Sequence, residues 1–124
     1  MLGRGTPGPG LELTARYVAD QFQRFGLKPG GDNGTWLQRF PVRGGTDTMT
    51  APNTVGILQG SDSALKQEYI VIVAHMDHIG FSRGRGQADS IYNGAADNAS
   101  GTAGVIELAK AFTQPGMASN TCWK

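Results

Sequence analysis

A short apolar run that ends abruptly in polar residues is the feature that most constrains how this chain can fold. Tyr69–Ala74 is apolar at every position, and His75 and Asp77 follow it directly. A run of this length is typical of a strand that is covered on both faces in the middle of a sheet. In open α/β sheets, ligands bind at the carboxyl ends of the strands. The sequence therefore predicts a central strand that brings His75 and Asp77 to a site at one edge of the sheet.

Two further segments are expected to be strands. The first is Thr35–Val42, in which Pro41 lacks a backbone donor and so favours a position at the edge of a sheet. The second is Asn53–Gln59, in which Val55 and Ile57 face the same way. Both precede the apolar run in the sequence, so three strands in all are expected.

Two segments have the apolar spacing of amphipathic helices. The first, Leu11–Phe25, is followed by Gly26, where a glycine cap would end the helix. The second runs from about Ser100 to Phe112, and either Asn98 or Ser100 can cap its start. The positions expected to be buried are Ala15, Val18, Ala19, Phe22 and Phe25 in the first helix, and Val105, Leu108, Ala109 and Phe112 in the second.

Composition excludes several classes of function. A formal net charge of +1 with scattered basic residues gives no basic surface for nucleic acid. No apolar run approaches the roughly 20 residues of a membrane-spanning helix, and Met1–Gly10 lacks the apolar stretch of a signal peptide. The lone Cys122 excludes an internal disulfide and a multi-cysteine metal site.

Three familiar motifs of other enzymes are absent or out of context. Gly3–Gly8 spells G-x-G-x-x-G, but no strand precedes it, so we do not expect dinucleotide binding. The P-loop pattern is missing. Asn98 and Thr102 stand where a serine nucleophile at Ser100 would need flanking glycines.

A functional site is expected where the His75–Asp77 segment and Asp97 converge. On an extended backbone His75 and Asp77 point the same way, so the carboxylate can hold one ring nitrogen while the other binds a cation. Asp97 stands immediately ahead of the second helix, where a carboxylate is stabilised by the helix dipole and can face the same pocket. Taken alone, His75 and Asp77 could simply be the polar end of a strand, and Asp97 could simply be a helix cap. Together they favour a metal site.

The combined motifs resemble those of the zinc-dependent exopeptidase family that includes bacterial leucyl aminopeptidases and glutamate carboxypeptidase. The similar region spans about Leu2–Phe112, and its most specific segments are Asn53–Gly56, Tyr69–Ala74, His75–Gly80 and Asp89–Gly101. The resemblance implies an α/β fold, namely the N-terminal portion of a mixed-sheet zinc-exopeptidase domain with helices on both faces, truncated after Phe112.

The resemblance also implies a mechanism and the residues for it. Two zinc ions about 3.5 Å apart would share a bridging water that attacks the peptide carbonyl. His75 would bind one zinc, Asp97 would bridge both, and Asp77 would be the catalytic carboxylate that orients His75. The peptide bond after Asp97 is typically cis in such enzymes. Ala96 stands where the family usually has a second acid that is not a ligand.

Other parts of the family's site are not found in the sequence. Its general-base glutamate, a neighbouring ligand glutamate, a further acidic ligand and the last histidine all follow the second helix. Glu107 is read as a solvent-facing partner of Lys110, and His78 as a loop or outer residue of the site. We therefore expect a metallopeptidase fragment that is inactive alone. The alternative is a non-catalytic binding or interaction domain that retains the peptidase fold.

The expected organisation is a peptidase portion over residues 1–112 and a patternless, disordered tail over residues 113–124. The expected partner is a peptide or an amino-acid derivative, with neither nucleic acid nor a membrane span. The compartment, the substrate side chain and the oligomeric state stay open, as does the choice among aminopeptidase, carboxypeptidase and cyclase chemistry. An unpaired strand edge and an exposed apolar sheet face are expected to cause aggregation or partial folding.

Overall fold

The computed structural model describes residues 2–43, 49–65, 67–82 and 90–114. Two helices and two small antiparallel sheets form the described part, which confirms the α/β class. The expected tail, residues 113–124, lies outside the described residues from residue 115 onward. The elements are a 3-10 turn (Leu2–Arg4), α1 (Pro9–Arg24), β1 (Lys28–Pro29), a 3-10 turn (Asp32–Gly34), β2 (Leu37–Pro41), β3 (Thr50–Thr54), β4 (Gly56–Ile57), a π-helical turn (Ala95–Ala99) and α2 (Ser100–Phe112).

Helix α1 is the centre of the described fold. Pro9 stands in its first turn, where a missing backbone donor costs nothing, and Gly26 follows its end with a left-handed φ of 82°. This confirms the glycine expected to end the helix. Its buried face includes Leu11, Ala15, Val18, Ala19 and Phe22, which repeat at helical spacing, whereas Phe25 is only partly buried.

The strands form two separate antiparallel pairs. β2 pairs with β3, with Leu37 opposite Thr54 and Pro41 opposite Thr50, and β1 pairs with β4. Because its sheet has only two strands, β2 is an edge strand, as Pro41 predicted. The second expected strand is divided, since Val55 separates β3 from β4.

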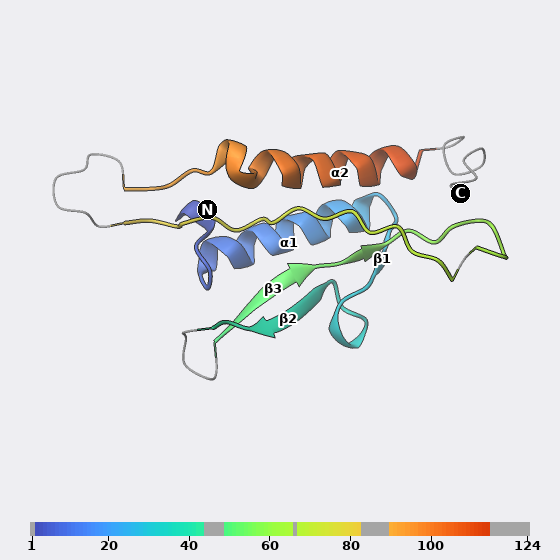
Figure 1. The fold of residues 1–124 in the computed structure, drawn as a ribbon, viewed down its shortest axis with the longest axis horizontal. Coiled ribbons are helices and arrows are strands. Elements are labelled where there is room, and N and C mark those ends of the chain that lie inside the picture. The colour runs from blue at the N-terminus through green and yellow to red at the C-terminus, as the bar shows by residue number, and fades with distance from the viewer. Residues whose placement is uncertain (1, 44–48, 66, 83–89, 115–124) are drawn as a thin grey trace.

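The expectation of a central strand at Tyr69–Ala74 is wrong. None of the described strands pairs with this segment, and Figure 1 shows it as an uncoiled run that crosses the side of the helices nearest the viewer. Its side chains are not covered on two sides, because Val71 is 76% and Val73 81% exposed. An apolar run can be a buried strand only if neighbouring strands satisfy its backbone, and the described residues supply none.

Helix α2 begins at Ser100 and ends at Phe112, as the sequence predicts, but its buried face is rotated. Ile106 is the buried residue, Val105 and Ala109 are partly buried, and Leu108 is 42% exposed. Ile106 packs in one cluster with Val18 and Phe22 of α1. The two helices run in the same direction (Figure 1), so both begin at the same end of the molecule. Among the described residues, neither these helices nor the shorter turns could cross a bilayer.

The first prediction concerns the ion pair between α1 and β2. Arg39 donates two hydrogen bonds of 2.8 Å to the Glu12 carboxylate, and this contact is the main reason that the pKa of Glu12 lies below its usual value. The stabilisation is therefore present above the pKa of the unfolded chain and is lost as pH falls through the folded pKa. Glu12→Gln should cost up to about 1 kcal/mol at pH 7, since the pair is partly exposed.

Urea unfolding at a series of pH values measures this difference. The gap between wild type and Glu12→Gln should close as the pH is lowered below about 4. Glu107→Gln is the control, because its partner Lys110 lies 3.5 Å away in an exposed pair. A gap that persists unchanged in acid would contradict the assignment of the stabilisation to the carboxylate charge.

The second prediction concerns the apolar run. Exposed apolar segments without strand partners favour association with other chains. Val71→Lys combined with Val73→Lys should lower self-association in sedimentation velocity without lowering thermal stability, because both side chains are exposed. Leu13→Lys is the matched control, since Leu13 is a 57% exposed apolar side chain on α1. Equal self-association in all three proteins would show that this run does not drive it.

Candidate metal site at the end of the apolar run

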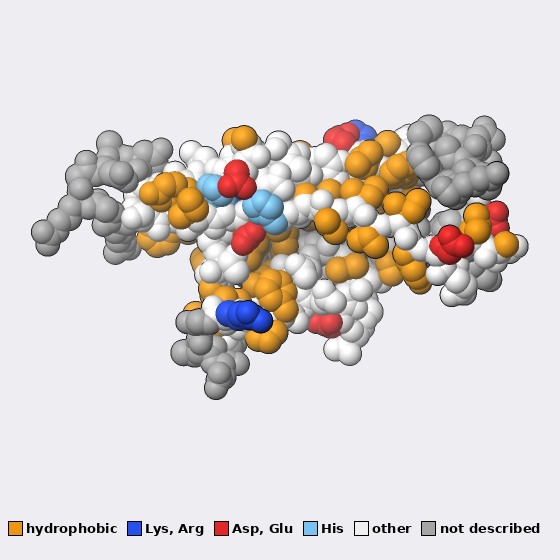
Figure 2. All heavy atoms as spheres, in the orientation of Figure 1, with side chains coloured by type: hydrophobic (Ala, Val, Ile, Leu, Met, Phe, Trp, Pro, Cys, Tyr) orange, Lys and Arg blue, Asp and Glu red, His pale blue; other side chains and the backbone are white. Residues whose placement is uncertain are grey.

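The His75 ring lies between the carboxylates of Asp77, two positions away in the sequence, and Asp97, 22 positions away. Its Nδ1 is 3.2 Å from Asp77 Oδ1, and its Nε2 is 3.1 Å from Asp97 Oδ1. Figure 2 shows histidine and acidic side chains together on one face of the molecule. His75 therefore contacts both of the carboxylates that were proposed from sequence.

Asp77 is fixed on both of its oxygens. Thr6 Oγ1 donates a 2.7 Å hydrogen bond to Oδ2, and Oδ1 faces His75. Partial burial acts to raise the pKa of Asp77, but the hydrogen bonds from Thr6 and His75 outweigh it and lower that pKa. The carboxyl group is therefore ionised at neutral pH and can only accept hydrogen bonds.

The charge on Asp77 determines which nitrogen of His75 is protonated. An ionised carboxylate has no proton to donate, so the contact with Asp77 requires a proton on His75 Nδ1. The lone pair of neutral His75 then lies on Nε2, which faces Asp97 Oδ1 at 3.1 Å. Two electron-rich atoms repel each other at this distance unless a proton or a cation lies between them.

Asp97 lies in an irregular turn just ahead of α2. Its φ of −117° and ψ of 91° are not helical, and the Asp97–Asn98 peptide bond is cis, which confirms the geometry that the resemblance implies. The Asn98 side chain accepts a hydrogen bond from the Gly101 backbone and so satisfies one backbone donor in the first turn of α2. Thr102 Oγ1 lies 3.2 Å from the His75 carbonyl oxygen and so joins α2 to the end of the apolar run.

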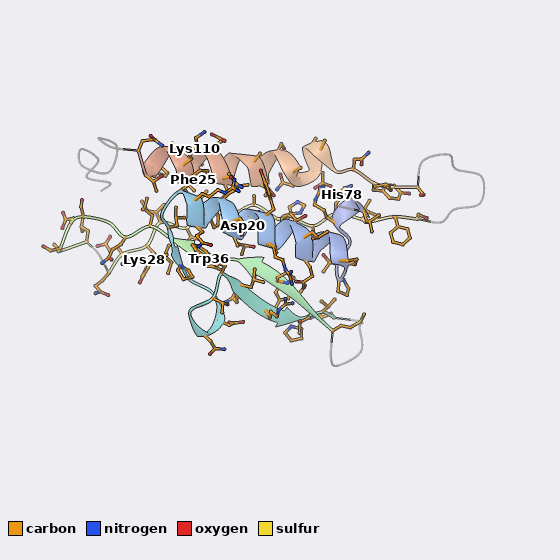
Figure 3. All side chains as sticks on the ribbon, turned by 180° about the vertical axis from the view of Figure 1, so that it is seen from behind. Asp20, Phe25, Lys28, Trp36, His78 and Lys110 are labelled. Carbon is orange, nitrogen blue, oxygen red and sulfur yellow. The ribbon has the colours of Figure 1, made fainter. Side chains whose placement is uncertain are left out.

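His78 lies beside the second oxygen of Asp97. Its Nδ1 is 3.6 Å from Asp97 Oδ2, and its side chain is only 13% exposed. Figure 3 shows His78 at the end of the molecule where both helices begin, far from Phe25 and Lys110. Glu107 pairs instead with Lys110 at 3.5 Å on the exposed side of α2, as expected from sequence.

Sequence reasoning missed two residues of the site, Arg4 and Thr6. Arg4 donates hydrogen bonds to the carbonyl oxygens of Met76 (2.9 Å), Asn93 (2.8 Å) and Gly94 (2.8 Å). In the sequence, the Gly3–Gly8 segment was weighed as a nucleotide-binding motif and as the start of the region that resembles the peptidase family, but neither residue was assigned to the site. Its glycines serve close packing instead, because a Cβ on Gly3 would overlap the Gly80 carbonyl oxygen.

A hollow of about 250 Å³ lies next to Thr6, the residue that contacts Asp77. Its wall consists of Leu2, Gly5–Gly10 and Ile79–Phe81. Thr6 belongs both to this wall and to the contact with Asp77. The exposed side chains of Leu2, Ile79 and Phe81 make part of this wall apolar.

The pair of His75 and Asp97 fits two positions of a zinc shell. Ligands about 2.0–2.1 Å from a tetrahedral zinc lie roughly 3.3 Å apart, and the observed 3.1 Å separation is close to this. In the described part of the chain, however, no group of three or more His, Cys, Asp or Glu side chains is arranged to hold a metal ion. The described residues thus offer two candidate positions, whereas a catalytic zinc has three protein ligands.

The third prediction concerns Gly94, which joins the two halves of the site. Its φ is 58°, and an added Cβ would come within 2.7 Å of His78 Cγ, the Asp97 carbonyl oxygen and Arg4 Nη2. Gly94→Ala should therefore destabilise the fold by about 1–3 kcal/mol. Gly104→Ala, in α2 with open space around it, should stabilise by about 0.5–1 kcal/mol. Thermal unfolding of both variants measures this, and shifts of the same sign would contradict the prediction.

Comparison with known proteins places these residues in one family. The sequence profile of Peptidase family M28 matches residues 53–121, which is more than half of the chain and includes His75, Asp77 and Asp97. No curated protein and no solved structure matches the chain. The matched region holds the polar end of the apolar run, the turn at Asp97 and helix α2. This chain belongs to Peptidase family M28.

Proposed function

We propose that this chain carries part of the metal site of a zinc-dependent, aminopeptidase-like hydrolase that cleaves peptide bonds. Peptidases of family M28 are generally zinc-dependent, and membership of the family implies a peptide substrate. His75 and Asp97 are the proposed metal ligands. Asp77 is the proposed carboxylate that orients His75, and the proposed complete site holds two zinc ions.

One observation supports the metal assignment most directly. The Nε2 atom of His75 and Oδ1 of Asp97 face each other at 3.1 Å, although 22 positions separate the two residues in the sequence. The hydrogen bond to Asp77 leaves the lone pair of His75 on Nε2, on the side that faces Asp97. Without a proton on Nε2 the two atoms repel each other, and a cation between Nε2 and Oδ1 would make the contact favourable.

Each of the three residues has a distinct proposed role. A bound zinc ion would polarise the peptide carbonyl and lower the pKa of a water molecule. Asp77 keeps the proton on Nδ1 and raises the basicity of the ligating nitrogen. Asp97 is suited to bridging, because its two oxygens face different histidines at 3.1 Å and 3.6 Å and its side chain is 71% exposed.

The second candidate function is a non-catalytic binding or interaction domain. The incomplete set of ligands in the described residues favours it, since a catalytic zinc has three protein ligands and an open position for water. One observation speaks against this second candidate. A metal site that has lost its function has no need of the Thr6–Asp77–His75 hydrogen bonds, and these are present.

The fourth prediction is that the 124-residue chain binds zinc weakly and hydrolyses nothing. Two protein ligands without a positioned base neither hold two metals firmly nor remove a proton from water. Zinc binding is measured by competition with a chromophoric chelator, and turnover with a leucyl chromogenic substrate. His75→Ala and Asp97→Asn should each abolish the weak zinc binding.

Glu107→Gln is the control variant and should bind zinc as the wild type does, because Glu107 pairs with Lys110 away from the site. Unchanged binding in His75→Ala and Asp97→Asn would refute the ligand assignment. Measurable turnover that resists removal of trace contaminants would refute the proposed inactivity and leave the ligand assignment intact.

A further inference from the structure

We propose that Arg4 and Thr6 are positioning residues of the metal site, which set the distance and orientation between His75 and Asp97. The inference rests on the proposed function for its biological meaning. The contacts that support it do not involve a metal. Neither residue touches the reacting atoms, so both act through other groups.

Arg4 is the most deeply buried charged residue of the described chain. It is 9% exposed, and its guanidinium donates to three backbone carbonyl oxygens at 2.8–2.9 Å. Burial of a guanidinium is costly unless its donors are satisfied, and hydrogen bonds from a charged donor are stronger than neutral ones. The contacts therefore fix the three carbonyl groups relative to one another.

Those carbonyl groups belong to the two segments that form the site. Met76 lies between His75 and Asp77, whereas Asn93 and Gly94 lie just ahead of the turn that holds Asp97. The planar guanidinium of an arginine can donate to three acceptors at once, whereas a lysine has one compact ammonium group that cannot reach all three. Arg4 thus determines how far the His75 segment stands from the Asp97 turn.

The backbone of the same segment strengthens this link. The His78 amide donates to the Arg4 carbonyl oxygen (3.0 Å), and the Gly80 amide donates to the Gly3 carbonyl oxygen (2.9 Å). Gly80 in turn accepts a hydrogen bond from the Tyr92 amide (3.0 Å). The Gly3–Thr6 segment is therefore bonded to the stretch after the apolar run, which is bonded to the stretch before Asp97.

Thr6 acts on the orientation of His75. Its hydroxyl holds Asp77 Oδ2 at 2.7 Å, which leaves Oδ1 to face His75 Nδ1. A carboxylate held on one oxygen cannot rotate freely, so the direction of its other oxygen is set. Outer partners of this kind fix the tautomer and orientation of a metal-binding histidine, and their loss typically lowers metal affinity about 10–100-fold.

The fifth prediction tests Thr6 in the metal-free chain. Thr6→Val keeps the shape and removes the donor, while Thr6→Ser restores it. The chain has two histidines, so ¹⁵N-histidine labelling gives two ring systems in a long-range ¹H–¹⁵N spectrum. The wild type and Thr6→Ser should show His75 protonated on Nδ1, and Thr6→Val should show a mixture of tautomers. Thr113→Val is the matched control, because its hydroxyl bonds only locally, to the Lys110 carbonyl oxygen.

Zinc affinity provides the second readout, measured by chelator competition on variants whose circular dichroism matches the wild type. Thr6→Val and Arg4→Lys should each lose about tenfold or more in affinity, with Thr6→Ser close to wild type. Arg39→Lys is the arginine control, because its partner Glu12 lies outside the site. An unchanged His75 tautomer in Thr6→Val would overturn the inference.

Failure of this inference and failure of the proposed function are distinguishable. If the wild type binds no zinc, the proposed metal site is wrong, and the metal-free spectra still decide whether Thr6 orients His75. If the wild type binds zinc and folded Arg4→Lys and Thr6→Val bind it equally well, the metal site stands and the positioning role is refuted. A Thr6→Ser variant that fails to restore the tautomer would also refute it.

Discussion

The buried guanidinium of Arg4 is the interaction on which the geometry of the site depends. Its three hydrogen bonds join segments that are more than 70 positions away in the sequence. Without it, three carbonyl groups would lose charged donors in a partly buried place, and unsatisfied groups of this kind typically cost about 1–3 kcal/mol each. The same contacts place the end of the apolar run beside the turn at Asp97. The Arg4 hydrogen bonds therefore contribute both to the stability of the fold and to the arrangement of the proposed ligands.

Helix α1 supplies the surface against which this arrangement is built. Its buried stripe packs against β3 and α2, and Val18, Phe22 and Ile106 form the common core. The helix begins shortly after Thr6, so a helix anchored by its apolar face also anchors the segment that reaches the site. Thr54 extends the same link, because its hydroxyl lies 3.1 Å from the Ala15 carbonyl oxygen. Packing and positioning are thus coupled through α1.

Local patterns predicted the helices well and the apolar run badly. The spacing of apolar residues and Gly26 located α1, and the capping residues Asn98 and Ser100 located the start of α2, because helix ends depend on nearby residues. The run Tyr69–Ala74 satisfies every local rule for a buried strand, yet it lies exposed on one side of the helices. Whether a strand forms depends on partners elsewhere in the chain, which a local pattern does not reveal. The buried face of α2 was misjudged for the same reason, since the position of α1 selects Ile106 over Leu108.

The sequence by itself determined the chemistry at the end of the apolar run, namely His75 and Asp77 two residues apart and Asp97 ahead of a helix. Backbone periodicity makes the first pairing a local matter, and the position of a carboxylate before a helix is equally local. The sequence also predicted that these residues converge, but only the tertiary structure decided their contacts and brought Arg4 and Thr6 to them. Hydrogen bonds between residues separated by 71 positions or more leave no periodic trace in the sequence, because they depend on how distant segments pack.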